Sequence, residues 1–279
     1  MVGADRDWVA VRSVLASTDP IPAYGGIAIS RGALEGMAES LNSGTIPMTA
    51  NHDSRQGIRA RNAVAGVREK SSGAFELFMS FEVHPDDWEK YGHLPGMSHT
   101  AIEAIRVDEV AQSSIVASFS ADAAWFDDGV IVSASRAVQS AIGQNSAIEN
   151  PGVLPSRVYQ FSIVPDARII IETSLVLFVA LGPNLVASAI WDGLKLAYAR
   201  RRIPKGGKAS AKTTVEIKID NGQSSITACV NTDDSAVAKE ALQVFGDAVS
   251  KFSFPETGKR VLAWTSDAKD GGGEWKEIQ

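Results

Sequence analysis

Short runs of alternating apolar and polar residues fill much of the first hundred positions, a pattern typical of strands joined by turns. Strand composition is found in Trp8–Leu15, Asn62–Glu69 and Phe75–Val83. Between the last two lies Lys70-Ser71-Ser72-Gly73, whose glycine adopts the unusual backbone angles of a hairpin turn without steric strain. We therefore expect an antiparallel sheet in this part of the chain.

A helix is predicted from Arg31 to Leu41, because apolar residues recur there at positions i, i+3, i+4 and i+7 behind Ser30, a favourable N-cap. The segment His84–Tyr91 resembles a short capped helix. Further along, Ser114–Phe126 has the loose alternation of a strand, and Val130–Gly143 is compatible with a helix. The first half of the chain thus mixes strands and helices.

The segment Ser174–Trp191 contains eighteen residues without a charge, and Arg200-Arg201-Arg202 follows it. This length is near the lower limit for crossing a bilayer, and a basic cluster is typical of a cytoplasmic flank. However, Gly182-Pro183-Asn184 interrupts the apolar run. We therefore expect buried or interfacial helices whose exposed parts favour self-association, with a membrane span as the alternative.

A small α+β module is predicted after the segment Ile203–Lys212, which has the basic, glycine-containing composition of a flexible linker. The module begins with an alternating strand, the strong hairpin turn Asn221-Gly222 and a return strand. A helix and two late strands follow. The change of composition at the linker suggests that this part folds separately.

Composition and charge narrow the class of protein. Hydrophobic residues make up 44% of the 279 positions and charged residues 22%, which indicates a globular protein with enough chain for a large core. The net charge of −6 argues against a chain-wide surface for nucleic acid, so no nucleic-acid partner is predicted. The only cysteine, Cys229, fits a reducing compartment, and the N-terminus lacks a signal-peptide pattern. We expect a cytoplasmic protein.

Histidines are the first candidates for chemistry. His84 and His93 lie near Asp86 and Asp87 in the sequence, which invites a metal site. The spacing of these residues matches neither a zinc nor a calcium site. We therefore predict no metal and no other cofactor.

His52 and Ser98 are better placed for catalysis. His52 follows the apolar run Ile46–Ala50, a predicted strand, and a histidine at a strand end can act as a general base because the ordinary pKa of its side chain is about 6.5. Ser98 needs such a base, and its neighbour His99 would point to the opposite face of an extended segment. The alternatives are a hydrogen-bonded surface histidine and a buried serine hydroxyl bonded to the backbone.

Several segments, in order, resemble the phage prohead maturation proteases, which share a fold with the herpesvirus assemblins. The matching segments are a helix at Ala33–Leu41, Ile46-Pro47-Met48 with Asn51-His52-Asp53, paired strands at 63–68 and 75–82, the nucleophile segment Leu94–Ser98, and the closing strand and turn at Val158–Ala167. The likeness covers about residues 8–168. It implies a barrel-like serine peptidase fold in which Ser98 is the nucleophile, His52 its general base and Gln160 the third member of the site.

Two departures from the family pattern bear on activity. The family has an acidic residue where this chain has Gln160, and a neutral amide orients an imidazole but stabilises its protonated form less than a carboxylate does. An extra stretch lies at Asp127–Pro155. A non-catalytic assembly or signalling module on the same fold is the leading alternative. Another is a membrane-associated defence effector, since the strand, strand and helix unit behind Arg200-Arg201-Arg202 resembles modules attached to effectors in bacterial conflict systems.

The predicted fold class is α+β: an antiparallel, barrel-like β domain with flanking helices, followed by a small α+β module. The predicted divisions are a prohead-protease-like domain at 1–168, an apolar helical segment with a basic end at 169–202, a linker at 203–212 and the module at 213–279. The predicted function is a serine endopeptidase that cleaves itself or a partner protein, as in capsid maturation. We expect it to form homo-oligomers through residues 169–202.

Overall fold

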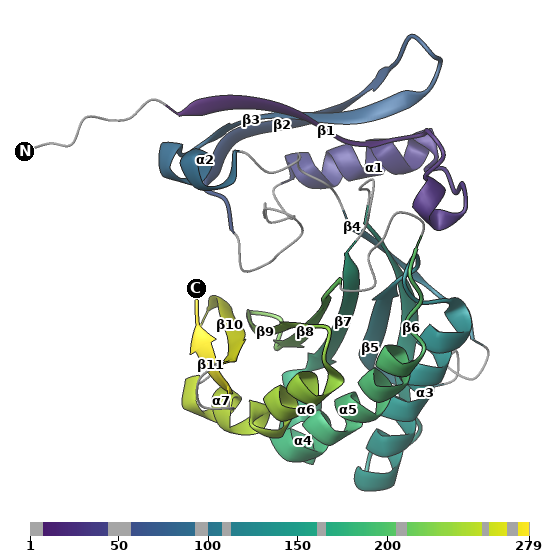
Figure 1. The fold of residues 1–279 in the computed structure, drawn as a ribbon, viewed down its shortest axis with the longest axis vertical. Coiled ribbons are helices and arrows are strands. Elements are labelled where there is room, and N and C mark those ends of the chain that lie inside the picture. Colours follow the sequence, from purple (N-terminus) through teal and green to yellow (C-terminus); the bar gives the residue numbers. More distant parts are fainter. Residues whose placement is uncertain are drawn as a thin grey trace, which may run out of the picture. The chain divides into compact units, whose positions relative to one another are not determined.

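The computed structural model describes residues 8–43, 57–92, 100–107, 113–160, 166–204, 211–252, 257–266 and 273–278. The chain divides into two compact units (Figure 1). Unit 1 is Met1–Thr100 with Gln160–Ile163, and unit 2 is Ala101–Tyr159 with Val164–Gln279.

Unit 1 is built on a three-stranded antiparallel sheet in the order β1-β3-β2. The strands are β1 (Val9–Ser17), β2 (Ala60–Glu69) and β3 (Phe75–Val83). The helices are the 3-10 turn η1 (Pro22–Tyr24), α1 (Arg31–Asn42) and α2 (Pro85–Tyr91). The predicted hairpin and the two predicted helices of this region are confirmed.

Alternation along β3 builds the core of unit 1. Four of its residues are buried on one face: Leu77, Met79, Phe81 and Val83. They belong to one cluster with Leu34 and Ala38, which lie four positions apart on α1 and therefore on the same side of that helix. The helix begins where the Ser30 hydroxyl accepts a hydrogen bond from the Ala33 N–H at 3.2 Å, as the sequence predicted.

Asn42, the last residue of α1, covers part of the outer edge of β2. Its Nδ2 donates to the carbonyl oxygen of Ala65 at 3.0 Å, and its Oδ1 accepts from the Ala65 N–H at 2.8 Å. One side chain thus satisfies both backbone groups of an edge residue, so another strand cannot pair with β2 at this point.

Unit 2 is built on an eight-stranded mixed sheet in the order β11-β10-β9-β8-β7-β5-β6-β4. Its strands are β4 (Thr100–Ala104), β5 (Ser114–Asp122), β6 (Pro151–Gln160), β7 (Ala167–Ser174), β8 (Thr213–Asp220), β9 (Ser224–Thr232), β10 (Gly258–Ser266) and β11 (Gly273–Glu277). Its helices are α3 (Asp128–Asn145), α4 (Leu175–Leu181), α5 (Pro183–Ala199), α6 (Ser235–Gln243) and α7 (Phe245–Phe252).

The sheet of unit 2 has an apolar face and a polar face. Helices α3, α5 and α6 lie on the apolar side (Figure 1), where Phe119 of β5 is fully buried. The packing is close, because a Cβ on Gly193 of α5 would lie 2.6 Å from Val138 Cγ2 and 3.2 Å from Phe119 Cε2. Strand alternation places polar residues on the other face. The buried ones include Ser120, Asp122, Ser156, Arg168, Glu216 and Thr227.

The α+β class is confirmed, but the described strands form two open sheets and no closed barrel. The chain also divides elsewhere than predicted. Because β8 pairs in parallel with β7, the strands after residue 212 extend the sheet that β5, β6 and β7 form instead of building a separate module. The two units separate near residue 100 and not at 168 or 203–212. Alternation predicts a strand but not its neighbour, and the crossover through α4 and α5 makes the parallel pairing feasible.

The basic end of the 169–202 segment is bound to the protein itself. Arg202 Nε donates to the carbonyl oxygen of Ala124 at 2.8 Å, and the Arg201 guanidinium lies 5.3 Å from the centre of the Trp125 ring. In the described parts of the chain no single helix has the length and apolar composition to cross a membrane, and α4 with α5 meets that test only as a pair bent by 107°. The two arginines therefore have a structural role in unit 2.

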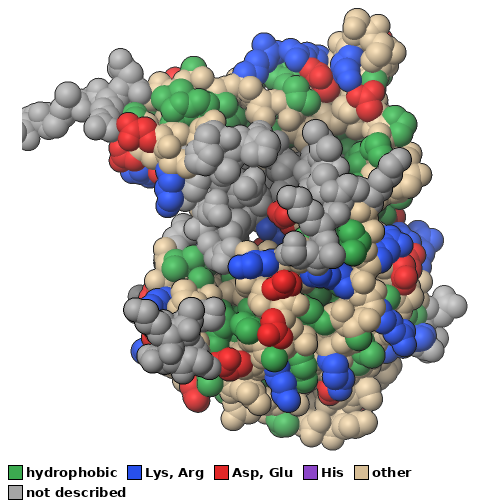
Figure 2. All heavy atoms as spheres, in the orientation of Figure 1, with side chains coloured by type: hydrophobic (Ala, Val, Ile, Leu, Met, Phe, Trp, Pro, Cys, Tyr) green, Lys and Arg blue, Asp and Glu red, His purple; other side chains and the backbone are tan. Residues whose placement is uncertain are grey.

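Charged side chains of both signs are interspersed over the face of unit 2 that Figure 2 shows. Ion pairs of unit 2 include Lys195 with Asp192 at 3.2 Å and Lys218 with Glu172 at 3.0 Å. Exposed pairs of this kind contribute little stability but keep a surface from presenting one sign of charge.

Candidate functional site

Gln160 is the one residue of the predicted site that the structure describes. His52 and Ser98 lie outside the described residues, in the stretches 44–56 and 93–99. Their approach to each other, and to Gln160, therefore stays a prediction.

Gln160 ends β6 and is fully buried. Its backbone N–H donates to the Tyr24 hydroxyl at 2.6 Å, and the same hydroxyl donates to the Gln160 carbonyl oxygen at 3.1 Å. Tyr24 ends η1 and is itself only 7% exposed. Because a single phenol satisfies both backbone groups of Gln160, it fixes the end of the closing strand.

Gln160 and the rest of its strand belong to different compact units. Gln160 lies in unit 1, whereas Pro151–Tyr159, the rest of β6, lies in unit 2. The described residues next to the first stretch, Ser43 and Gly57, are also in unit 1, as are Gly92 and Thr100 beside the second. The chain thus enters and leaves the two stretches that contain His52 and Ser98 within the unit that holds Gln160.

An ion-pair network fixes β6 just before Gln160. Arg157 donates to both carboxylate oxygens of Asp128 at 2.8 and 2.6 Å and to Glu103 Oε2 at 3.0 Å, and the Tyr159 hydroxyl donates to the same Glu103 oxygen at 3.1 Å. The hydrogen bond from Arg157 lowers the pKa of Asp128, whereas burial and the bond to Glu103 raise the pKa of Tyr159. Because one guanidinium binds a carboxylate on each side, the network holds β4, β6 and the start of α3 together.

A buried ion pair lies on the polar face of the unit 2 sheet. Arg168 Nη2 of β7 is 3.5 Å from Glu216 Oε1 of β8, and the two residues are 5% and 3% exposed. Glu216 Oε1 accepts no hydrogen bond from the described residues, so the contact is electrostatic. The pair was not among the residues predicted from the sequence. Only Arg168 gave a signal, because it directly precedes three isoleucines, where a buried strand rarely carries a charge, whereas Glu216 stands in an alternating strand like an ordinary exposed charge.

Two titratable residues lie near this pair. Cys229 of β9 stands opposite Glu216 in the strand register and is fully buried, which keeps its thiol from reactants. Lys259 of β10 is exposed as a whole, but its amine loses part of its contact with water, which lowers its pKa. The negative charge of Glu216 raises that pKa again in part. The arrangement supplies charge balance in the interior of the sheet, and we assign it no reaction.

His84 has a structural role. Its Nδ1 accepts a hydrogen bond from the Asp86 N–H at 3.4 Å at the start of α2, and its ring meets Trp8 edge-on. Arg59 pairs with Asp87 at 2.9 Å, and its hydrogen bond lowers the pKa of that carboxyl. Within the part of the chain that the structure describes, no three His, Cys, Asp or Glu side chains gather as metal ligands would. His93 lies outside that part.

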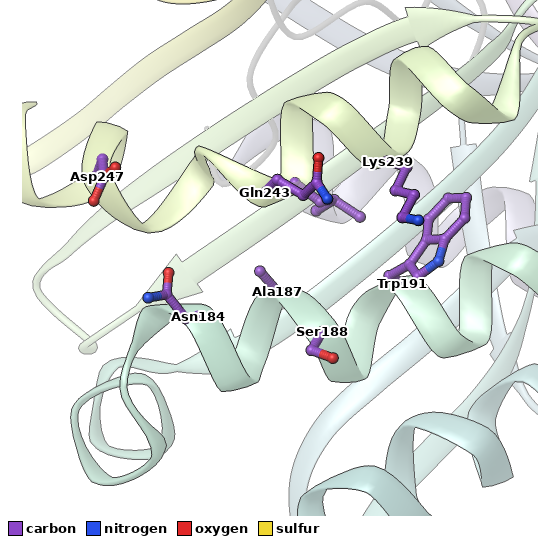
Figure 3. Close-up of a pocket in the computed structure, with 8 residues that line it drawn as sticks. Asn184, Ala187, Ser188, Trp191, Lys239, Gln243 and Asp247 are labelled. Carbon is purple, nitrogen blue, oxygen red and sulfur yellow. The ribbon is translucent and has the colours of Figure 1, made fainter.

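Unit 2 also contains an open groove between α5 on one side and α6 with α7 on the other (Figure 3). Its volume is about 370 Å³. We call it the α5–α7 groove, and its lining consists of Asn184, Ala187, Ser188 and Trp191 from α5, Lys239, Leu242 and Gln243 from α6, and Asp247 from α7. The sequence did not predict this groove, because its two walls come from segments about fifty positions apart.

No family model, curated protein or solved structure matches this chain. The likeness to the prohead proteases therefore rests on the residues quoted for it, and the function is proposed from the residues and contacts described above.

The homo-oligomer predicted through residues 169–202 stays a prediction, and α4 offers the surface to test it. Val176 and Val179 are 79% and 72% exposed. Burying two valines at an interface contributes several kcal/mol, so the double change Val176→Asp/Val179→Asp should weaken association at least about tenfold. Light scattering after size exclusion at several concentrations measures this, with Val64→Asp in β2, 60% exposed and outside residues 169–202, as the control. A monomeric wild-type chain would contradict the prediction.

Proposed function

We propose that this chain is a serine endopeptidase of the prohead-maturation type that cleaves itself or a partner protein. The observation that carries the proposal is the position of Gln160. Tyr24 holds it by both backbone groups in unit 1, the unit from which the stretches containing His52 and Ser98 depart. This supports the proposal because Gln160 belongs to the same compact unit as the segments that contain His52 and Ser98.

The proposed chemistry divides the work among these three residues. The Ser98 hydroxyl attacks a peptide carbonyl while His52 accepts its proton, and His52 then returns the proton to the leaving amine. Backbone N–H groups stabilise the oxyanion. The Gln160 amide orients the imidazole but stabilises its protonated form less than a carboxylate would, so we expect a slow enzyme. The single buried cysteine, Cys229, supports a reducing compartment, and we propose the cytoplasm.

A non-catalytic assembly or signalling module is the second candidate, and the burial of Gln160 favours it. A neutral amide at a fully buried strand end, with its backbone satisfied by Tyr24, is also what a purely structural position requires. The two candidates differ in what a carboxylate at this position would do.

Replacing Gln160 with glutamate separates them. In a peptidase, a carboxylate beside His52 stabilises the imidazolium, and we expect cleavage to rise by about tenfold or more. Mass spectrometry of the intact chain and of a mixed peptide library, sampled over time, measures the rate. Gln160→Met is the matched control of similar size, and Ser98→Ala in the Gln160→Glu chain should remove the gain.

In a non-catalytic module the same change should only destabilise the fold. A buried carboxyl holds its proton more tightly in the folded than in the unfolded chain, so the loss of stability grows as the pH rises above the ordinary glutamate pKa of about 4.3. Thermal unfolding of Gln160→Glu at pH 4.5 and pH 8 shows this. Absence of cleavage products in all variants, together with this pH trend, would reject the peptidase and leave the module.

A further inference from the structure

The α5–α7 groove has the size and the rigid walls of a ligand site. Its volume of about 370 Å³ lies within the range of pockets that hold small ligands. The wall between α5 and α7 is closely packed, because a Cβ on Gly246 would lie 2.7 Å from Pro183 Cβ and 3.0 Å from Asn184 Oδ1. The Phe178 and Phe245 rings of α4 and α7 also meet edge-on, with centroids 6.0 Å apart. The groove is therefore formed before any ligand arrives.

The groove carries opposite charges at its two ends. Figure 3 shows Lys239 with Trp191 at one end and Asp247 with Asn184 at the other. Among the described residues Lys239 has no carboxylate within ion-pair distance, and Asp247 has no basic group within that distance. A cation and an anion are thus held apart on different helices, each without a partner in that part of the chain. A ligand with one charge of each sign would neutralise both.

The middle of the groove suits amide groups. Ala187 and Leu242 are buried and form an apolar floor. Gln243 and Ser188 lie between the charged ends (Figure 3), and neither makes a side-chain hydrogen bond to a described residue. A glutamine amide donates and accepts at once, as a peptide bond does, and a serine hydroxyl can do either. The flat indole of Trp191 offers apolar contact at the cationic end.

We propose that the α5–α7 groove binds a short peptide with free ends, whose carboxylate lies at Lys239 and whose ammonium group lies at Asp247. A small inorganic anion would use Lys239 alone and leave the rest of the groove unoccupied. A ligand without amides would leave Gln243 and Ser188 without partners. The proposal does not depend on peptidase activity, because it rests on residues of unit 2 alone.

Calorimetric titration of the full-length chain with three forms of trialanine tests the proposal. The probes are trialanine with free ends, its C-terminal amide and its N-acetyl form. We expect each cap to weaken binding about tenfold or more, because each removes one charge-assisted interaction. Lys239→Gln should weaken binding of free trialanine to a similar extent but leave the affinity for the C-terminal amide unchanged. Asp247→Asn should likewise weaken binding of free trialanine, but it should leave the affinity for the N-acetyl form unchanged.

The controls lie on α5 beside the groove. Lys195 and Asp192 pair with each other at 3.2 Å and do not line the groove, so Lys195→Gln and Asp192→Asn remove the same charges nearby without touching the site. Both should bind free trialanine as the wild type does. No binding of free trialanine, or equal binding of the capped and free forms, would overturn the proposal, as would an equal loss in the control variants.

Discussion

Ser98→Ala and His52→Ala are each expected to reduce cleavage by roughly 10³-fold or more, and the double variant should lose little beyond either single one. A hydroxyl is a weak nucleophile until a base accepts its proton, and without the nucleophile the base cannot accelerate the reaction. The two residues act as a unit, so their effects cannot add. Time courses of product formation from the chain itself and from the peptide library give the three rates.

Two matched controls in unit 1 keep this result interpretable. Ser40→Ala removes an exposed hydroxyl that donates to the Gly36 carbonyl oxygen at 3.0 Å within α1, and it should not change the rate. His84→Asn replaces the histidine at the start of α2 by a good N-cap. All variants should unfold within a few degrees of the wild type. Cleavage that persists in Ser98→Ala would remove Ser98 as the nucleophile.

Local features of the fold could be predicted from the sequence because their causes are local. The spacing of apolar residues behind Ser30 predicted α1 to within one residue at its end. The turn before β3 was equally predictable, since Gly73 has a φ of 80° that favours glycine. Helix caps and hairpin turns depend on a few neighbouring residues, so a single sequence contains the information.

The arrangement of the strands could not be predicted in the same way. β5 lies between β6 and β7, parallel to one and antiparallel to the other, and β8 follows β7 in the sheet after a crossover of two helices. Each of these strands alternates or is apolar, which gives its faces but not its neighbour. The strands predicted after residue 212 exist, but they extend the sheet of unit 2 and do not form a separate module. A barrel was expected from the resemblance and not from any pattern in the residues.

The candidate site was predictable only in part for the same reason. Gln160 was identified through the resemblance, but its contact with Tyr24 joins residues 136 positions apart. Arg168 was conspicuous as a charge before three isoleucines, but its pairing with Glu216 follows from the parallel register of β7 and β8. The α5–α7 groove likewise depends on how α5 packs against α6. A sequence shows which residues could react or bind, whereas the fold decides which of them come into contact.

The pairing of Arg168 with Glu216 leads to the second large effect. Glu216→Ala removes the Glu216 carboxylate from beside a buried guanidinium, and we expect unfolding to require about 3–5 kcal/mol less free energy. The charge-free pair Arg168→Met/Glu216→Leu should recover most of that loss, because two apolar side chains need no desolvation of charge. Urea unfolding followed by circular dichroism gives the free energies of the wild type and of each variant.

The same two strands supply the control for this experiment. Lys218 of β8 and Glu172 of β7 form a second ion pair at 3.0 Å, but their side chains are 33% and 47% exposed. Water screens both charges there, so Glu172→Ala should cost at most about 1 kcal/mol. The difference between the two variants isolates the effect of burial, since the strands, the sheet and the types of charge are shared. If Glu216→Ala were no more destabilising than Glu172→Ala, the polar face of this sheet would be open to water in solution. The conclusion that Arg168 and Glu216 form a buried ion pair would then be wrong.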